Sequence, residues 1–180
     1  MYKMILAGYG GQGMLLSGQV LSLAAINDGY KVTWFPSYGP EMRGGAAACS
    51  VVVSEKPIGS PVVKSADLVA AVSQPAFDKY HAAVVSGGTI LYNSNIIVVS
   101  DKRDDIRYTG IDFSRLTMDI GNSKVYNMLV LGSIKELLGC VTVPSLTAAL
   151  KEKFGEKKKD LLELNEKAIL MGIEAVKRLA

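Results

Sequence analysis

The sequence predicts an α/β fold in which helices flank a mainly parallel sheet and a helical tail ends the chain. Short apolar runs alternate with segments of helical periodicity through the first half of the chain. A glycine-rich turn joins the first apolar run to the first helical segment. From Asp119 onward, apolar residues recur at helical spacing. The 180 residues suit a single domain spanning 1–180.

The first three elements are predicted as strand, helix and strand. Tyr2–Ala7 is rich in large apolar residues, as expected of a buried parallel strand. Met14–Asp28 has one apolar face, and Gly29 supplies a helix stop. Tyr30–Phe35 is β-rich. A right-handed crossover would make this second strand a parallel neighbour of the first.

The remaining elements follow from apolar runs, turn residues and helical spacing. Gly87 and Gly88 predict a turn before the strand at Thr89. Pro144 marks a helix start. The predicted strands are Ala46–Ser54, Leu68–Val72, Thr89–Asn93, Ile96–Ser100 and Arg107–Ile111. The predicted helices are Pro75–Ala83, Lys124–Gly139, Leu146–Phe154 and Lys158–Leu179.

Composition argues against a nucleic-acid or membrane role. The net charge of +3 is spread along the chain, and the one dense run, Lys157–Lys159, is flanked by acids, which favours a solvated helix start. No apolar stretch is long enough to span a bilayer. The apolar N-terminal run is broken at Gly8, too early for a signal peptide. A cytoplasmic location is therefore expected.

Cysteine and histidine are too few for a metal centre. A zinc or iron–sulfur site needs three or four such ligands. The chain has Cys49, Cys140 and His81, widely separated. No metal site is expected in this chain, and both cysteines are expected to be free thiols. Cys49 is predicted to be buried and inert, whereas Cys140, after Gly139 at a helix end, could be exposed, although nothing nearby marks it as a nucleophile.

The first motif is Gly8–Gly13, which fits G-x-G-x-x-G between a strand and a helix, a Rossmann-like arrangement. The glycines serve either close helix–sheet packing or a phosphate or other anion at the helix N-terminus. The segment Thr33–Pro36 offers neither the acid nor the arginine of dinucleotide sites, which disfavours NAD(P) and FAD. The candidate cofactor-binding residues are Gly8, Gly10, Gly11, Gln12 and Gly13.

The second motif is the loop Tyr38–Gly45, which follows the second predicted strand. In an open α/β sheet, loops at the carboxyl edge face ligands, so this loop and the first motif are expected to be neighbours. One interpretation is an internal pair between Glu41 and Arg43. The other is a surface for a partner chain or an anionic substrate. Tyr38, Glu41, Arg43 and Gly44 are its candidate residues.

The two motifs together resemble the gamma subunit of 2-oxoacid:ferredoxin oxidoreductases. The resemblance continues in Ser65–Ala70 and Ser73–Tyr80, and is looser after Asn95. A loop reading Tyr-Gly-Pro-Glu-x-Arg-Gly-Gly is most similar to that of the 2-oxoglutarate branch. The pyruvate, branched-chain 2-oxoacid and indolepyruvate branches are alternatives.

The resemblance implies a subunit with no complete active site and no catalytic residues of its own. The enzymes of this family oxidatively decarboxylate a 2-oxoacid and release an acyl-CoA, CO₂ and reduced ferredoxin. Thiamine diphosphate with magnesium would be held by alpha and beta chains, and iron–sulfur clusters by a ferredoxin-like delta chain. The gamma domain would help to close the coenzyme A side. A free-standing dinucleotide-binding regulatory module is the alternative function, and an independent dehydrogenase is a weaker one.

Several other polar residues are interpreted as structural. His81 is expected at a helix end rather than as a base, since no nucleophile set accompanies it. The aspartates at 101, 104 and 105 alternate with basic residues, which favours a solvated loop over a cation site. Asn93 and Asn95 are expected to fix a turn.

Overall fold

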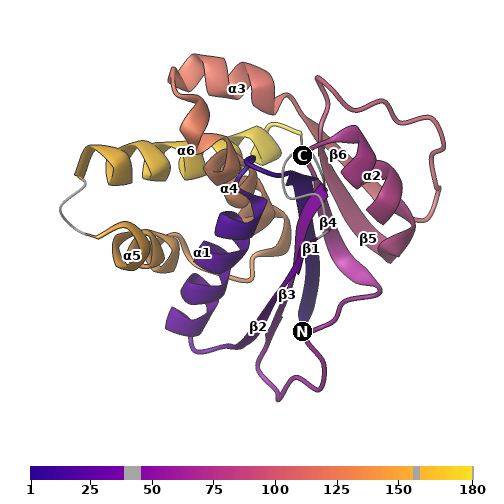
Figure 1. The fold of residues 1–180 in the computed structure, drawn as a ribbon, viewed down its shortest axis with the longest axis horizontal. Helices are drawn as coiled ribbons and strands as arrows, with labels where there is room; N and C mark the ends of the chain where they lie inside the picture. The colour runs from indigo at the N-terminus through magenta and orange to yellow at the C-terminus, as the bar shows by residue number, and fades with distance from the viewer. Residues whose placement is uncertain (39–45, 156–158, 180) are drawn as a thin grey trace.

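The computed structural model describes residues 1–38, 46–155 and 159–179. A six-stranded sheet lies at its centre, in the order β2-β3-β1-β4-β5-β6, with helices on both faces (Figure 1). The predicted α/β class is confirmed. The strands are β1 (Tyr2–Tyr9), β2 (Lys31–Tyr38), β3 (Ala46–Ser54), β4 (Ala66–Ala71), β5 (Val84–Asn93) and β6 (Arg107–Ile111).

The helices divide unevenly between the two faces of the sheet. Figure 1 places α1 and the later helices on one side and α2 on the other. The helices are α1 (Met14–Asn27), α2 (Gln74–Tyr80), η1 (His81–Ala83), α3 (Phe113–Ile120), η2 (Ser123–Val125), α4 (Tyr126–Leu138), α5 (Val143–Phe154) and α6 (Lys159–Lys177), where η denotes a 3-10 helix.

The position of β2 corrects the predicted crossover. β1, β4, β5 and β6 pair in parallel, as expected. β3 is antiparallel to both β1 and β2 and lies between them. β2 therefore runs in the direction of β1 without being its neighbour. The chain can do this because β2 and β3 form an antiparallel hairpin, which needs no crossover helix.

Two local predictions were wrong: the turn at Gly87 and Gly88, and the strand at Ile96–Ser100. Each was inferred from a short sequence signal without its neighbours in the fold. Gly87 and Gly88 lie inside β5, where the pairing with β4 shifts register. The run from Ile96 to Ser100 is not a strand. There the amide of Gln74 accepts from Val98 N at 2.8 Å and donates to Val98 O at 3.1 Å, in place of a neighbouring strand.

The helix α3 was missed in the sequence. It has only eight residues and a single fully buried side chain, Phe113, although Leu116 and Ile120 follow at helical spacing and pack against the core. Its caps were a further signal. Asp112 accepts a hydrogen bond from Arg115 N at 2.8 Å, and Gly121 ends the helix in the left-handed conformation, with φ of 76°.

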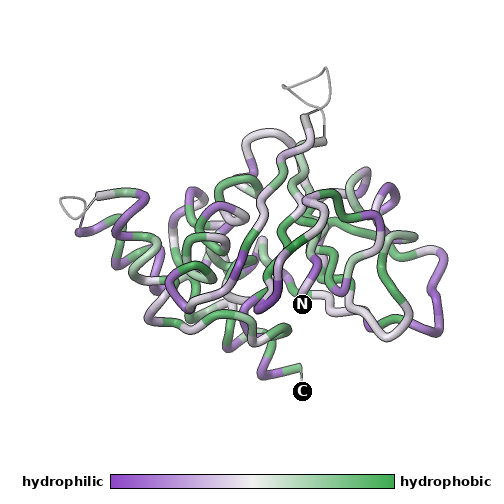
Figure 2. Tube along the Cα trace, turned by 90° about the horizontal axis from the view of Figure 1, so that it is seen from below, coloured by the Kyte–Doolittle hydropathy of each residue, from purple (hydrophilic) through white to green (hydrophobic). Residues whose placement is uncertain are grey.

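Two apolar cores lie on opposite faces of the sheet. The larger joins alternate residues of β1 and β3, such as Met4, Leu6 and Val51, to α1, α4, α5 and α6. The smaller joins the other face to α2 and includes Ile5 and Phe77. Figure 2 shows hydrophobic segments in the interior and hydrophilic ones at outer turns. Burial on both faces explains the nearly continuous apolar runs of β1 and β4.

The helices α4 and α6 pack with their backbones in close approach. A Cβ added to Gly132 would stand 2.0 Å from Ile169 O, and one added to Gly172 would stand 2.0 Å from Leu129 O. Ser133 Oγ donates to Gly172 O at 3.0 Å across the same contact. Glycine is therefore required at both positions for this packing.

Within the described parts of the chain, no helix combines the length and apolar character needed to cross a bilayer.

Candidate functional site

The glycine loop connects the carboxyl end of β1 to the first turn of α1. Gln12 N donates to Tyr9 O at 3.1 Å and closes the turn. Gly13 is the N-cap of α1 in the left-handed conformation, with φ of 77°, and it offers no side chain to cap the helix. The N–H groups of the first turn therefore receive no side-chain acceptor from the cap position, and the positive end of the helix dipole points toward the loop.

Gln12 fixes the loop to the neighbouring strand end. Its Oε1 accepts from Tyr9 N at 2.6 Å, and its Nε2 donates to Val72 O at 3.2 Å, just beyond β4. Both polar ends of this amide are used inside the chain. In this structure Gln12 sets the position of the loop rather than presenting a free amide.

Two of the motif glycines are required by packing. A Cβ on Gly8 would stand 2.5 Å from Gln12 Oε1 and 2.5 Å from Val72 Cγ2. A Cβ on Gly13 would stand 2.8 Å from the Asn127 amide. The packing interpretation of these two positions follows directly from their neighbours.

The other two glycines, Gly10 and Gly11, are exposed. Gly11 has φ of 97°, and no atom lies within 4 Å of where its Cβ would be. Space and backbone donors are therefore both present at the tip of the loop, as an anion site requires.

Asn127 supports the loop from α4 and was missed in the sequence. Its Nδ2 donates to Gly13 O at 3.3 Å, and its backbone O accepts from Ser17 Oγ at 2.9 Å. A polar residue in the apolar run of α4 was the only signal, and spacing in sequence gave no indication of its partner, 114 positions away.

The flanks of the second motif lie at the same edge as the glycine loop. Ala46 pairs with Tyr9, at the end of β1, and Tyr38 pairs with Ala47. The segment between Tyr38 and Ala46 therefore begins and ends at this edge. Glu41, Arg43 and Gly44 lie outside the described residues.

The neighbouring strand ends add polar side chains to this edge. Asn93, at the end of β5 and 1% exposed, donates to Ser114 Oγ at 3.1 Å and to Tyr126 OH at 3.2 Å. Its Oδ1 accepts from Asn95 N at 3.2 Å, which confirms the predicted turn. Burial raises the pKa of Tyr126 to about 12, although the hydrogen bond to Asn93 opposes it. Tyr126 is therefore a neutral hydrogen-bonding group at physiological pH.

The topology also bears on dinucleotide binding. In dinucleotide sites, the carboxylate that binds the ribose stands at the end of the second strand, which lies next to the first strand in the sheet. Here β3 occupies that place and runs the opposite way. The absence of an acid in Thr33–Pro36 and the inserted strand agree in disfavouring this class.

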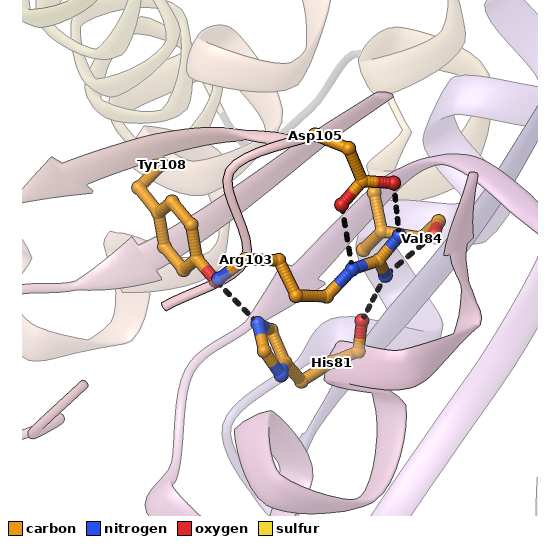
Figure 3. A network of polar contacts seen from close by, with 5 residues as sticks. All are labelled: His81, Val84, Arg103, Asp105 and Tyr108. Carbon is orange, nitrogen blue, oxygen red and sulfur yellow. Dashed lines mark hydrogen bonds and ion pairs between the residues drawn. The ribbon is translucent and has the colours of Figure 1, made fainter. Parts of the chain in front are cut away.

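His81 and the aspartate loop form a structural network away from the glycine loop (Figure 3). His81 Nε2 lies 2.5 Å from Tyr108 OH. Arg103 donates to both oxygens of Asp105, at 2.9 and 2.7 Å, and to Val84 O at 2.8 Å. The hydrogen bonds from Arg103 lower the pKa of Asp105. His81 lies at the end of α2, as predicted, and the aspartates at 101, 104 and 105 are exposed, as expected of a solvated loop.

Cys140, for which the sequence allowed exposure, is buried. Cys140 is 1% exposed, because the left-handed Gly139 cap turns the chain back into the core. Burial raises its pKa to about 11, and burial raises that of Cys49 to about 12. Both are free thiols. Neither has the thiolate character of a nucleophile at neutral pH.

Among residues 1–38, 46–155 and 159–179, no group of three or more histidine, cysteine or carboxylate side chains is placed to hold a metal ion.

Comparison with known proteins places the chain among subunits of one enzyme family. The family model described as pyruvate ferredoxin/flavodoxin oxidoreductase matches residues 3–175. The ketoisovalerate oxidoreductase subunit VorA of Methanothermobacter thermautotrophicus is 35% identical over 94% of this chain. This chain spans 35% of that relative's length.

Two further similar proteins match this chain along nearly their whole length. The 2-oxoglutarate synthase subunit KorC of Methanocaldococcus jannaschii is 34% identical, over 97% of this chain and 93% of that subunit. The crystal structure of a keto/oxoacid ferredoxin oxidoreductase gamma subunit from Geobacter sulfurreducens is 31% identical, with a TM-score of 0.84 and 99% coverage of both chains. The resemblance read from the two motifs is confirmed, and the chain belongs to the pyruvate ferredoxin/flavodoxin oxidoreductase family.

Proposed function

We propose that residues 1–180 form one domain that serves as the gamma subunit of a thiamine diphosphate-dependent 2-oxoacid:ferredoxin oxidoreductase. Family membership and the full-length match to a gamma subunit support this assignment. The observation that carries it is the sharing of one sheet edge by the glycine loop and the flanks of the second motif. Decarboxylation and electron transfer take place on the alpha, beta and ferredoxin-like delta chains, with thiamine diphosphate, magnesium and iron–sulfur clusters.

The proposed role of this edge is to hold the phosphates of coenzyme A at the entrance of the assembled active site. Backbone N–H groups at Gly10 and Gly11 and the N-terminus of α1 supply donors, and Gln12 and Asn127 keep the loop in place. Arg43 adds a cation for a phosphate or a partner carboxylate, and Glu41 orients it. Tyr38 and Gly44 belong to the same proposed contact surface.

The proposed substrate is 2-oxoglutarate. The KorC relative matches along 93% of its length, and its name is that of a 2-oxoglutarate synthase subunit. The comparably similar VorA relative makes ketoisovalerate the second candidate. Selection of the 2-oxoacid side chain is assigned to the partner chains, so the assay must use the whole complex.

A steady-state assay of the assembled complex tests the coenzyme A role. Arg43→Ala is expected to raise the KM for coenzyme A about tenfold, with a smaller effect on kcat, because a ground-state contact is lost. Arg107→Ala is the matched control, since Arg107 begins β6 at the opposite edge and is exposed. Unchanged assembly and unchanged KM in Arg43→Ala would contradict the proposal.

Two further measurements separate the alternatives. Turnover with 2-oxoglutarate, ketoisovalerate and pyruvate ranks the substrate branches. Titration of the isolated chain with NADH, NADPH and FAD addresses the rival function. Tight binding of a dinucleotide by the lone chain, without partner subunits, would favour a regulatory module instead.

A further inference from the structure

A groove with a volume of about 830 Å³ lies between α3 and α6, and none of its lining residues belongs to the glycine loop. Gly110 and Ile111, at the end of the outermost strand β6, contribute to its floor. Leu116 of α3 and Met171 and Ala175 of α6 line it with half-buried apolar surface. α3 packs on α4, and α6 packs on both α4 and β6, so α4 supports the two helices that line the groove.

The helix α6 presents a second face to this groove. One face, with Ile169, Gly172 and Ile173, is buried against α4 and its neighbours. Residues that line the groove recur every three or four positions from Glu163 to Arg178. At 1.5 Å per residue, this stretch is about 22 Å long. Leu170, on this face, is 50% exposed, and Leu179 beyond the helix is 60% exposed. Exposed apolar side chains that gather in one groove, rather than singly, are typical of a contact surface.

The rim of the groove is acidic although the chain is basic. Five carboxylates and three cations line it, a formal charge of −2, in a chain of net charge +3. Arg115 is already paired with Asp119 at 3.1 Å, and Glu174 is paired at 3.2 Å with Lys177, which does not line the groove. Outside these pairs, the lining keeps three carboxylates and two cations. In the described part of the chain, Glu163 and Glu166 form no ion pair. The unneutralised charge of the rim is therefore negative.

We infer that this groove receives a basic amphipathic helix from a partner subunit of the complex. The inference rests on the proposed function, because it names a contact within that assembly. Apolar side chains of the incoming helix, spaced three and four residues apart, would cover Leu170 and Met171. Its lysines or arginines would meet Glu163 and Glu166. The length of the groove face accommodates about four helical turns.

A second copy of this chain is a poorer occupant. In a two-fold contact, the same surface of both copies meets, so the two grooves would lie against each other. Two rims that each carry a formal charge of −2 would then be brought together. Such juxtaposition of like charges opposes association.

Site-specific photocrosslinking in the assembled complex tests the inference. Leu170→p-benzoylphenylalanine is compared with the same change at Ile26, an exposed apolar residue of α1 outside the groove, 55% exposed. The expected product at position 170 is a partner-subunit peptide with apolar residues at helical spacing and more basic than acidic residues. A crosslink to another copy of this chain, to an acidic peptide, or at no higher yield than from position 26 would overturn the inference.

Charge reversal gives an independent readout. Glu163→Lys with Glu166→Lys is expected to weaken assembly by about tenfold at low ionic strength, and by less at high salt, because screening reduces the lost attraction. Glu55→Lys with Glu152→Lys is the matched control, since both residues are exposed and neither lines the groove. Equal effects of the two pairs on the dissociation constant would overturn the inference. Unchanged thermal unfolding of the isolated variants shows that folding is not the cause.

The outcomes distinguish this inference from the proposed function. An active complex whose crosslinks from position 170 fall elsewhere overturns the groove contact alone. Failure of the chain to assemble with any thiamine-binding subunits overturns the proposed function and the groove contact with it.

Discussion

Glycine serves opposite purposes in the helix pair α4–α6 and in the loop between β1 and α1. At Gly132 and Gly172, the missing side chain makes room for the backbone of the opposite helix. At Gly11, the space beside the Cα is open, and the backbone has φ of 97°. The first pair is needed by the fold, whereas the loop tip leaves room for something outside the chain. Gly8 and Gly13 lie between these extremes, packed against side chains that can move.

The difference shows what a glycine motif alone conveys. In sequence, the G-x-G-x-x-G spacing is the conspicuous feature, and the glycines of α4 and α6 are isolated. In the structure, the isolated glycines have the least tolerance for a larger residue. Three glycine substitutions would test this contrast, and a fourth substitution, at Asp28, tests a helix contact that involves no glycine. They are ordered by expected effect.

Gly172→Ala is expected to cause the largest loss, about 3 kcal/mol in the free energy of unfolding. Its methyl group would stand 2.0 Å from Leu129 O, so α4 and α6 would have to separate. Urea unfolding measures the loss. Gly59→Ala is the control, because Gly59 has open space and no left-handed backbone, and it should be nearly neutral. Equal stability of the two variants would contradict the close-packing argument.

Gly8→Ala is expected to cost about 2 kcal/mol, because the atoms it meets belong to the side chains of Gln12 and Val72. Displacing Gln12 breaks its hydrogen bonds to Tyr9 and Val72. Amide hydrogen exchange at Tyr9 should therefore become faster than in the wild type. Unchanged exchange there, together with a stability loss, would mean that the Gln12 bridge does not hold the loop.

Gly11→Ala is expected to cost only about 1 kcal/mol, the strain of a left-handed backbone for a residue with a side chain. If the loop tip holds coenzyme A, the KM for coenzyme A should also rise several-fold. Gly87→Ala is the matched control, with φ of 78° and open space but a position on β5 far from this loop. If the KM for coenzyme A were similar in the two variants, the loop tip would not be the site that holds coenzyme A.

Asp28→Asn is expected to cost no more stability than Gly11→Ala, and its effect depends on pH. Asp28, at the end of α1, accepts hydrogen bonds from Thr142 N at 2.7 Å and from Ser145 Oγ at the start of α5. Partial burial raises its pKa, but these hydrogen bonds outweigh burial and leave the pKa below its ordinary value of 3.8.

A carboxyl group whose pKa is lower in the folded state stabilises that state at any pH above the pKa of the unfolded group. This stabilisation is lost as the pH falls through the pKa of the folded group. The free energy of unfolding of the wild type should therefore exceed that of Asp28→Asn by about 1 kcal/mol at pH 7. This difference should shrink below about pH 4. Urea titrations across this range measure the gap. A difference that stays constant with pH would show that the charge of Asp28 contributes nothing.

Most strands and long helices could be predicted from the sequence, because their burial leaves apolar runs of the right period. β3 and β6 were placed with their observed bounds, Ala46–Ser54 and Arg107–Ile111. The order of the strands could not be predicted. Nothing in the apolar pattern of β2 or β3 distinguishes a strand beside β1 from one displaced by a hairpin, since both bury the same face.

The sequence predicted only those parts of the candidate site that belong to a continuous motif. The glycine loop was found from spacing, and its proximity to the second motif from the rule that carboxyl ends share an edge. Asn127 and the Gln12 contact with Val72 are long-range, and single polar residues carry no pattern that names a partner. The burial of Cys140 could not be predicted, because burial after a helix end depends on where the chain turns, which Gly139 decides.

The order of the strands also has a consequence for how the protein emerges from the ribosome. Residues 1–54 contain β1, α1, β2 and β3, and β3 pairs with both β1 and β2 inside this segment. Each later strand then pairs with the last one placed on the growing side: β4 with β1, β5 with β4, and β6 with β5. The nascent chain can therefore build its sheet outward in the order of translation, without opening any pairing already made.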